Sequence, residues 1–155
     1  MNHSNPLNQD AKCLRERAMN YLARREHTVK ELVTKLEKVG FEYDDIIAVI
    51  TRLTEQNLQS DQRFAENYTR YRSHRGFGIQ KVRQELRARG VDVELINDTL
   101  KHADIDWFSL AMIVRCKRFG EQRPDDFKER AKQQRFLQCR GFTHEHITES
   151  FNTEK

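Results

Sequence analysis

The stretch that decides the fold runs from residue 86 to residue 100 and reads LRARGVDVELINDTL. A helix that passes through Leu86 can end at Gly90, because glycine adopts the left-handed conformation at a helix C-terminus without steric cost. Val91 would then fold back on the helix just ended. Ile96 and Leu100 lie four residues apart and would share one face of the next helix. The stretch therefore predicts a helical hairpin that turns at Gly90.

The same pattern occurs three times, at intervals of 50 and then 51 residues. In each copy a leucine lies four residues before a glycine, and apolar residues lie one, six and ten residues after it. The aligned positions are Leu36, Leu86 and Leu137; Gly40, Gly90 and Gly141; Phe41, Val91 and Phe142; Ile46, Ile96 and Ile147; and Ile50, Leu100 and Phe151. Self-similarity at this period is typical of a helical-repeat protein.

Each predicted hairpin has its own start signal. Thr28 and Glu31 have the spacing of a capping box, and Asp126 with Glu129 is an aspartate version of it in the third copy. In the second copy, residues 76–78 (Gly-Phe-Gly) form a break between helices. A further helix precedes each hairpin and is marked by an apolar stripe: Leu14, Ala18, Tyr21 and Leu22; Phe64, Tyr68 and Tyr71; and Trp107, Leu110, Ala111, Val114 and Phe119.

These signals predict an all-α protein of nine helices, organised as a tandem repeat of three three-helix units over residues 10–57, 58–104 and 105–153. Runs with the period of a strand are absent from the sequence. A three-helix unit of this size is marginal alone, so neighbouring units should pack on one another, which predicts an elongated, curved protein. The first ten residues match no motif, and we expect them to be disordered.

Composition narrows the class of protein. Of the 155 residues 37% are apolar and 34% are charged, and the formal net charge is +4. Such a chain can be disordered, but the helical periodicity argues against that here, and the positive charge favours an acidic partner. Cys13, Cys116 and Cys139 are odd in number and far apart, as expected of reduced thiols. With no long apolar run and no visible signal peptide, we expect a cytoplasmic monomer.

The basic residues are concentrated in two stretches. Residues 63–89 hold eight basic and two acidic residues, and residues 115–140 hold nine and four. The last predicted helix of the middle unit is acidic instead, with Asp92, Glu94, Asp98 and Asp104 against Lys101. This segregation predicts a basic surface for an acidic protein or a phosphate backbone, although single arginines could simply pair with nearby carboxylates. Tyr68 and Tyr71 lie within it but on an apolar stripe, so we expect them in the core.

The sequence offers no catalytic, metal or cofactor chemistry. His144 and His146 are two residues apart and would point to different faces of a helix. The Gly-Phe-Gly of residues 76–78 follows no strand and has no third glycine, which favours a turn over a nucleotide-binding loop. We therefore predict a binding protein without enzymatic activity, metal or cofactor.

The ordered motifs resemble those of the RecX family, the bacterial regulators of the RecA recombinase, over about residues 12–152. The motifs that carry the resemblance are Asp61-Gln62-Arg63-Phe64-Ala65, Ser73-His74-Arg75-Gly76-Phe77-Gly78, Arg83-Gln84-Glu85-Leu86, Asp104-Ile105-Asp106-Trp107, Arg118-Phe119-Gly120, Gln134-Arg135-Phe136-Leu137 and Arg140-Gly141-Phe142. The resemblance implies tandem three-helix repeats, binding to RecA–single-stranded DNA filaments in the helical groove, and inhibition of RecA ATP hydrolysis, strand exchange and coprotease activity. It thus implies a part in DNA repair, recombination and the SOS response.

Both arguments together give the predicted contact residues for RecA or single-stranded DNA: Arg70, Arg72, Arg75, Lys81, Arg83, Arg87, Arg115, Lys117, Arg118, Lys132 and Arg135. An alternative role for Arg63, Arg135 and Arg140 is to cap or pair within the fold. Two other functions stay open at this point. One is a direct nucleic-acid-binding module without a RecA target, and the other is an adaptor whose basic face serves solubility.

Overall fold

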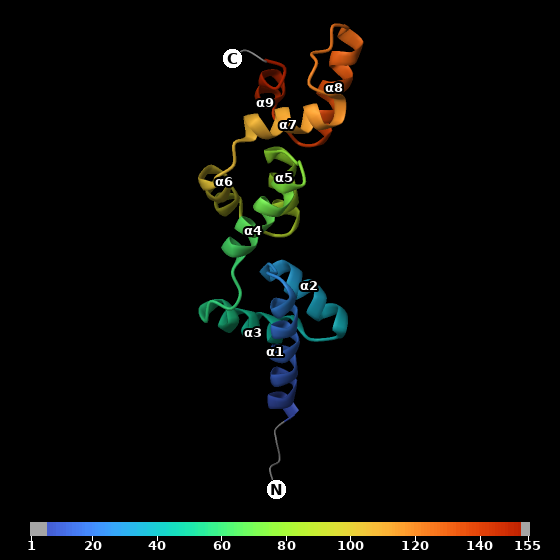
Figure 1. Ribbon diagram of the computed structural model, residues 1–155. Coiled ribbons are helices and arrows are strands. Elements are labelled where there is room, and N and C mark those ends of the chain that lie inside the picture. The colour runs from blue at the N-terminus through green and yellow to red at the C-terminus, as the bar shows by residue number, and fades with distance from the viewer. Residues whose placement is uncertain (1–5, 153–155) are drawn as a thin grey trace. The chain divides into compact units, whose positions relative to one another are not determined.

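The computed structural model describes residues 6–152, and this part of the chain forms nine helices and no strand (Figure 1). The helices are α1 (Pro6–Arg24), α2 (Val29–Val39), α3 (Tyr43–Glu55), α4 (Asp61–His74), α5 (Ile79–Ala88), α6 (Val93–His102), α7 (Trp107–Phe119), α8 (Phe127–Cys139) and α9 (His144–Glu149). The all-helical prediction is confirmed. Residues 6–10 belong to α1, so the prediction of disorder was wrong for them, and residues 1–5 and 153–155 lie outside the described part.

The backbone divides into two compact units. Of the described residues, unit 1 contains 6–65 together with 89–92, and unit 2 contains 66–88 and 93–152. The proposed boundaries of the three-helix units, at residues 57 and 104, stay a prediction. Within the described range no helix combines the length and apolarity that crossing a membrane requires.

The core of unit 1 lies where α1, α2 and α3 meet (Figure 1). α2 begins at the predicted capping box, in which the Thr28 hydroxyl accepts from the Glu31 amide and the Glu31 carboxylate accepts from the Thr28 amide. It ends at Gly40, which has the predicted positive φ of 107°. The side chains buried between these helices, none more than 2% exposed, are Leu14, Ala18, Leu32, Leu36, Ile46, Ile50 and Leu53. Each buried leucine or isoleucine stabilises the unit by about 1.5–3 kcal/mol.

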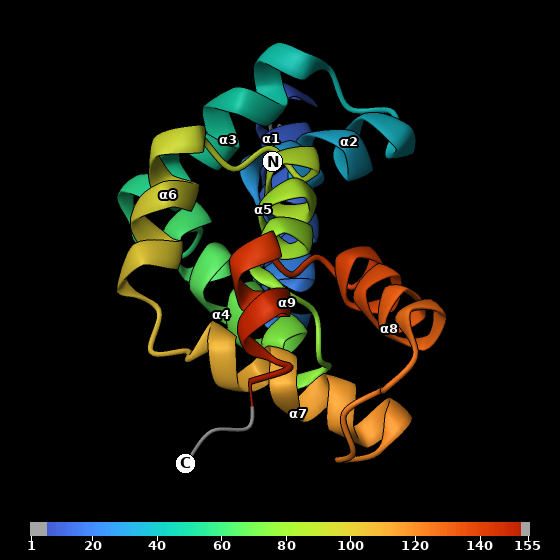
Figure 2. The same ribbon diagram turned by 90° about the horizontal axis from the view of Figure 1, so that it is seen from above.

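The main core of unit 2 lies between α7, α8 and α9, which pack on one another (Figure 2). Its buried residues are Ala111, Val114, Leu137, Phe142, Ile147 and Phe151. Leu137, Phe142, Ile147 and Phe151 are the third-copy members of the four apolar positions predicted from the repeat. Their burial confirms the register of the third copy.

The Arg-Gly pair at residues 89–90 docks against the start of α2 within unit 1. The Arg89 carbonyl accepts a 2.7 Å hydrogen bond from the Thr28 hydroxyl, and the Arg89 guanidinium lies 3.0 Å from the Glu31 carboxylate. Gly90 has a φ of +88°, and a Cβ there would lie 2.5 Å from the Cβ of Lys30. Both the left-handed backbone and the close approach therefore require glycine.

The Arg-Gly pair at residues 140–141 docks in the same way against the start of α5, within unit 2. The Gly78 amide donates to the Arg140 carbonyl and the Gln80 amide donates to the Gly141 carbonyl, each at 2.8 Å. These contacts satisfy amides at a helix N-terminus that have no partner inside the helix. A Cβ on Gly141 would lie 2.5 Å from the backbone nitrogen of Lys81. The first copy differs, because a Cβ on Gly40 would meet nothing within 4 Å.

Alanine substitutions at Gly40, Gly90 and Gly141 should distinguish the cost of a left-handed backbone from the cost of a close approach by a neighbouring helix. Gly40→Ala adds only the strain of a left-handed non-glycine residue, about 1–2 kcal/mol. Gly141→Ala adds that strain and a collision with the helix backbone at Lys81, so we expect it to lose about 1–3 kcal/mol more. Urea unfolding, monitored by circular dichroism, measures the free energy of unfolding of each variant.

Gly90→Ala is the intermediate case, since its Cβ would meet only side-chain atoms of Lys30. Its loss should lie between those of the other two variants. Equal losses for Gly40→Ala and Gly141→Ala would show that the close approach at Gly141 has no energetic consequence.

A buried histidine lies beside the start of α2. His27 is 2% exposed, its Nδ1 lies 3.0 Å from the Arg25 carbonyl oxygen, and its Nε2 lies 2.9 Å from Lys35 Nζ. Because an ammonium group can only donate, Nε2 is the acceptor and Nδ1 carries the proton. Burial of the ring, together with the charges of Arg25 and Lys35, lowers the pKa of His27 below its usual value of 6.5.

Unit 1 should therefore lose stability in mild acid. The unfolded chain takes up a proton at His27 as the pH falls through about 6.5, whereas the folded chain resists it until a lower pH, so the free energy of unfolding falls over that interval. His27→Gln should flatten the dependence between about pH 8 and about pH 5.5 in urea unfolding. A slope in His27→Gln equal to that of the wild type would show that His27 is not the group responsible.

Candidate partner-binding surface

The turn between α4 and α5 places arginines beside α7. Gly76 has a φ of +83°, its amide donates to the Ser73 carbonyl at 2.9 Å, and the Phe77 amide donates to the Arg72 carbonyl at 3.1 Å. A Cβ on Gly76 would lie 3.1 Å from Val114 Cγ2, so the turn packs closely on α7. The Gly-Phe-Gly segment is thus the predicted turn between two helices.

Guanidinium groups alternate with phenylalanine rings through unit 2, an arrangement that we call the arginine–phenylalanine ladder. Arg72 lies 3.8 Å and Arg140 lies 4.7 Å from the centroid of Phe77. Arg140 also lies 5.4 Å from the centroid of Phe136, and Arg118 lies 5.8 Å from it. Each such contact contributes about 0.5–2 kcal/mol. The ladder holds the turn after α4, the end of α7 and α8 together without neutralising the arginines.

Within the described part of the chain, Arg72 is the member of the ladder that forms an ion pair with a carboxylate. Its Nε and one terminal nitrogen each lie 2.8 Å from the Glu85 carboxylate, which also accepts from the Tyr68 hydroxyl at 2.6 Å. Partial burial alone would raise the pKa of Glu85, but the hydrogen bonds from Arg72 and Tyr68 lower it. Glu85 stays ionised and neutralises Arg72.

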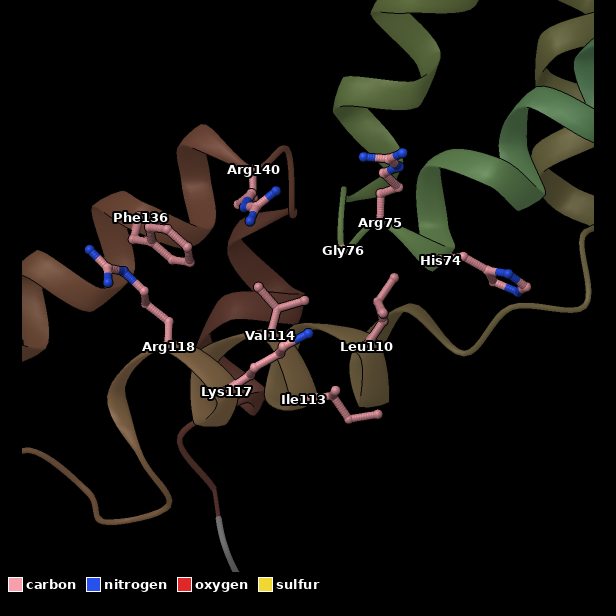
Figure 3. A pocket seen from close by; sticks show the side chains of 10 residues that line it. All are labelled: His74, Arg75, Gly76, Leu110, Ile113, Val114, Lys117, Arg118, Phe136 and Arg140. Atoms are coloured by element: carbon pink, nitrogen blue, oxygen red, sulfur yellow. The ribbon is translucent and has the colours of Figure 1, made fainter.

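The ladder borders a groove of about 530 Å³ between the end of α4, α7 and α8. The residues that line this basic groove are His74, Arg75, Gly76, Leu110, Ile113, Val114, Lys117, Arg118, Phe136 and Arg140 (Figure 3). Figure 3 shows Phe136 between the side chains of Arg118 and Arg140. The lining contains four arginine or lysine side chains, one histidine and no carboxylate. Walls of this kind concentrate a positive potential and attract anions.

The structure brings together three of the predicted contact residues, Arg75, Lys117 and Arg118, in the lining of the basic groove. Four others are exposed but outside the lining: Arg70, Arg87, Lys132 and Arg135. Three are half-buried and contact the protein itself. Arg72 pairs with Glu85, Arg83 donates to the Asn97 side chain, and Lys81 lies against Gly141. The lining of the basic groove therefore includes only part of the predicted set.

Arg115 requires a correction. It is 0% exposed, its Nε donates to the Ser150 carbonyl at 3.0 Å, and its guanidinium lies 4.9 Å from the centroid of Phe151. A side chain without exposed surface cannot contact a partner, so Arg115 belongs to the core of unit 2 and not to the binding surface.

Sequence reasoning misjudged Tyr71 and was incomplete for Arg140. Tyr71 was expected in the core but is 52% exposed, with Arg75 over its ring at 5.2 Å. Arg140, considered for pairing within the fold, does stack on two rings but also lines the basic groove. Phe136 was not considered as a site residue at all. The alternation of arginine and phenylalanine in the motifs of residues 118–119 and 135–136 is the signal that could have indicated it.

No metal centre accompanies the groove in the described residues, where no three histidine, cysteine or acidic side chains gather closely enough to hold an ion. Cys13, Cys116 and Cys139 are free thiols. His144 is exposed, whereas His146 is buried and stacks edge-on against Phe108 at 4.6 Å.

Nine helices in the described residues, with three copies of one sequence pattern, define a tandem helical-repeat protein. The domain families that match are the first, second and third three-helix domains of RecX, over residues 15–53, 60–100 and 104–149. The chain belongs to the RecX family.

Known proteins of similar sequence or fold align with most of the length of this chain. The regulatory protein RecX of Halorhodospira halophila is 41% identical over 137 residues, which cover 88% of this chain and 85% of that protein. The protein of the same name from Pseudomonas entomophila is 41% identical, with 86% of each chain covered. The crystal structure of RecX from Lactobacillus salivarius is 22% identical and has a TM-score of 0.78, covering 92% of this chain and 94% of that one. This last comparison supports the fold alone.

Replacing the buried Arg115 should lower the free energy of unfolding more than replacing the exposed Arg118 does. Arg115→Met leaves the Ser150 carbonyl without its donor inside the core, which costs about 1–3 kcal/mol. Arg118→Met removes an exposed side chain together with its contact to the Phe136 ring, and should cost about 0.5–1 kcal/mol. Urea unfolding of the two variants tests this, and equal midpoints would contradict the assignment of Arg115 to the core.

Proposed function

We propose that this chain binds RecA–single-stranded DNA filaments in their helical groove, inhibits RecA ATP hydrolysis, strand exchange and coprotease activity, and thereby limits filament growth. Membership in the RecX family is the observation that carries the proposal, since relatives at about 40% identity are named regulatory protein RecX. The proposal includes a cytoplasmic monomer without catalytic activity that takes part in DNA repair and the SOS response.

The basic groove is the surface that we assign to the filament. Arg75, Lys117 and Arg118 line it, and the contact with the Phe136 ring holds the Arg118 side chain in place. A filament of RecA on single-stranded DNA offers phosphates and acidic side chains as counter-charges. Occupying the filament is sufficient for inhibition, because a bound chain opposes any later change in filament geometry that its contacts do not fit.

A direct nucleic-acid-binding module is the second candidate. The observation that favours it is Tyr71, an exposed aromatic ring next to Arg75, since such pairs stack on the bases of single strands. Binding to bare single-stranded DNA without any effect on RecA would establish this second function in place of the first.

Reversing two charges in the basic groove should weaken inhibition of the RecA ATPase on single-stranded DNA. Arg75→Glu with Lys117→Glu changes an attractive surface into a repulsive one, so half-inhibition should need roughly tenfold more protein. Both residues are exposed, so helical content should not change.

The control reverses two exposed charges of α1, Lys12→Glu with Arg17→Glu, which alters the net charge by the same amount. It should inhibit like the wild type. If both double variants inhibit equally, the basic groove is not the contact surface, and if the wild type does not inhibit at all, the proposed function fails.

A further inference from the structure

The outer face of α7 carries large apolar side chains that the core of unit 2 does not use. Trp107, Ala111 and Val114 point inward and are buried, whereas Phe108, Met112 and Ile113 are 40%, 37% and 59% exposed. A helix that is apolar on opposite faces is normally covered on both. The outer face of α7 therefore has the composition of a contact surface.

Ile113 forms a ridge between two hollows. It lines the basic groove on one side and, on the other, a hollow of about 680 Å³ that is lined by Met112, Ile113, Cys116, Glu121, Gln122 and Arg123. The second hollow contains one carboxylate and one guanidinium, so the excess of positive charge lies on the groove side of the ridge. A partner on this ridge would meet apolar side chains and cations next to each other (Figure 3).

The basic groove offers no free aromatic face to a nucleic-acid base. Phe136, its one ring besides histidine, is half-buried, lies between Arg118 and Arg140, and meets Phe119 edge-on at 5.3 Å. Single strands bind such surfaces by stacking bases on aromatic rings. The side chains next to the cations are instead aliphatic, the exposed Ile113 and the half-buried Leu110, and they match an apolar side chain better than a phosphate or a sugar.

We propose that the basic groove and the Ile113 ridge bind an acidic protein segment that carries an aliphatic side chain. Its carboxylates pair with Arg75, Lys117 and Arg140, while its aliphatic side chain packs on Ile113 and Leu110. Charge complementarity identifies this occupant, because the groove lining supplies several cations and no carboxylate of its own. This assignment rests on the proposed function, since it gives the groove to the protein part of the filament and not to the DNA.

The test compares three labelled probes by fluorescence anisotropy with the full chain. They are a synthetic peptide of glutamate and leucine, the same peptide with every leucine replaced by serine, and oligothymidylate. The wild type should bind the leucine peptide about tenfold more tightly than the serine peptide. Ile113→Ser should abolish that preference and leave oligothymidylate binding unchanged, whereas Lys117→Ser should weaken both peptides.

Ile113 is largely exposed, so its replacement leaves the core intact, and circular dichroism verifies this for each variant. Equal binding of the two peptides by the wild type would overturn the inference. So would a parallel loss of oligothymidylate binding in Ile113→Ser, which would assign the groove to nucleic acid. A chain that prefers the leucine peptide but never inhibits the RecA ATPase would retain this inference and refute the proposed function.

Discussion

The docking of an Arg-Gly pair onto the start of a preceding helix is the contact on which the repeat arrangement depends. At both Arg89-Gly90 and Arg140-Gly141 the arginine carbonyl accepts a hydrogen bond from the region of a helix N-terminus, and the glycine has no Cβ to obstruct the approach. At Arg140-Gly141 the donors are amides that have no partner inside the helix, whereas at Arg89 the donor is the Thr28 hydroxyl. The first copy has Val39 before Gly40, and no neighbour lies within 4 Å of a Cβ built there.

The second of these contacts also shapes the basic groove. When the Arg140 carbonyl meets Gly78, its guanidinium comes to lie between the rings of Phe77 and Phe136, and the basic groove opens beside them. Stacking on a ring stabilises a guanidinium without removing its charge. Arg72 shows the opposite case, because Glu85 neutralises it. Fold and surface therefore share residues, and a change at Arg140 alters both.

The sequence was sufficient to predict the fold because the repeat depends on local rules. Helix caps, left-handed glycines and four-residue spacing act within a few residues, and Leu36, Leu86 and Leu137 are all completely buried as predicted. The surface was predicted only in part, since it depends on contacts across helices. Arg115 and Lys117 are two residues apart and equally basic, yet the Ser150 carbonyl, 35 residues away, draws Arg115 into the core. Nothing near Arg115 in the sequence indicates that partner.

The charges of unit 2 are better explained by binding than by solubility. A surface that serves only solubility can mix both signs, and mixed charges avoid self-repulsion. Here residues 92–104 of the middle repeat hold four carboxylates, Asp92, Glu94, Asp98 and Asp104, while the lining of the basic groove contains none. Cations kept together without counter-charges weaken the folded state through mutual repulsion. An acidic partner removes that repulsion when it binds, so the arrangement gains free energy in the complex that the isolated chain does not have.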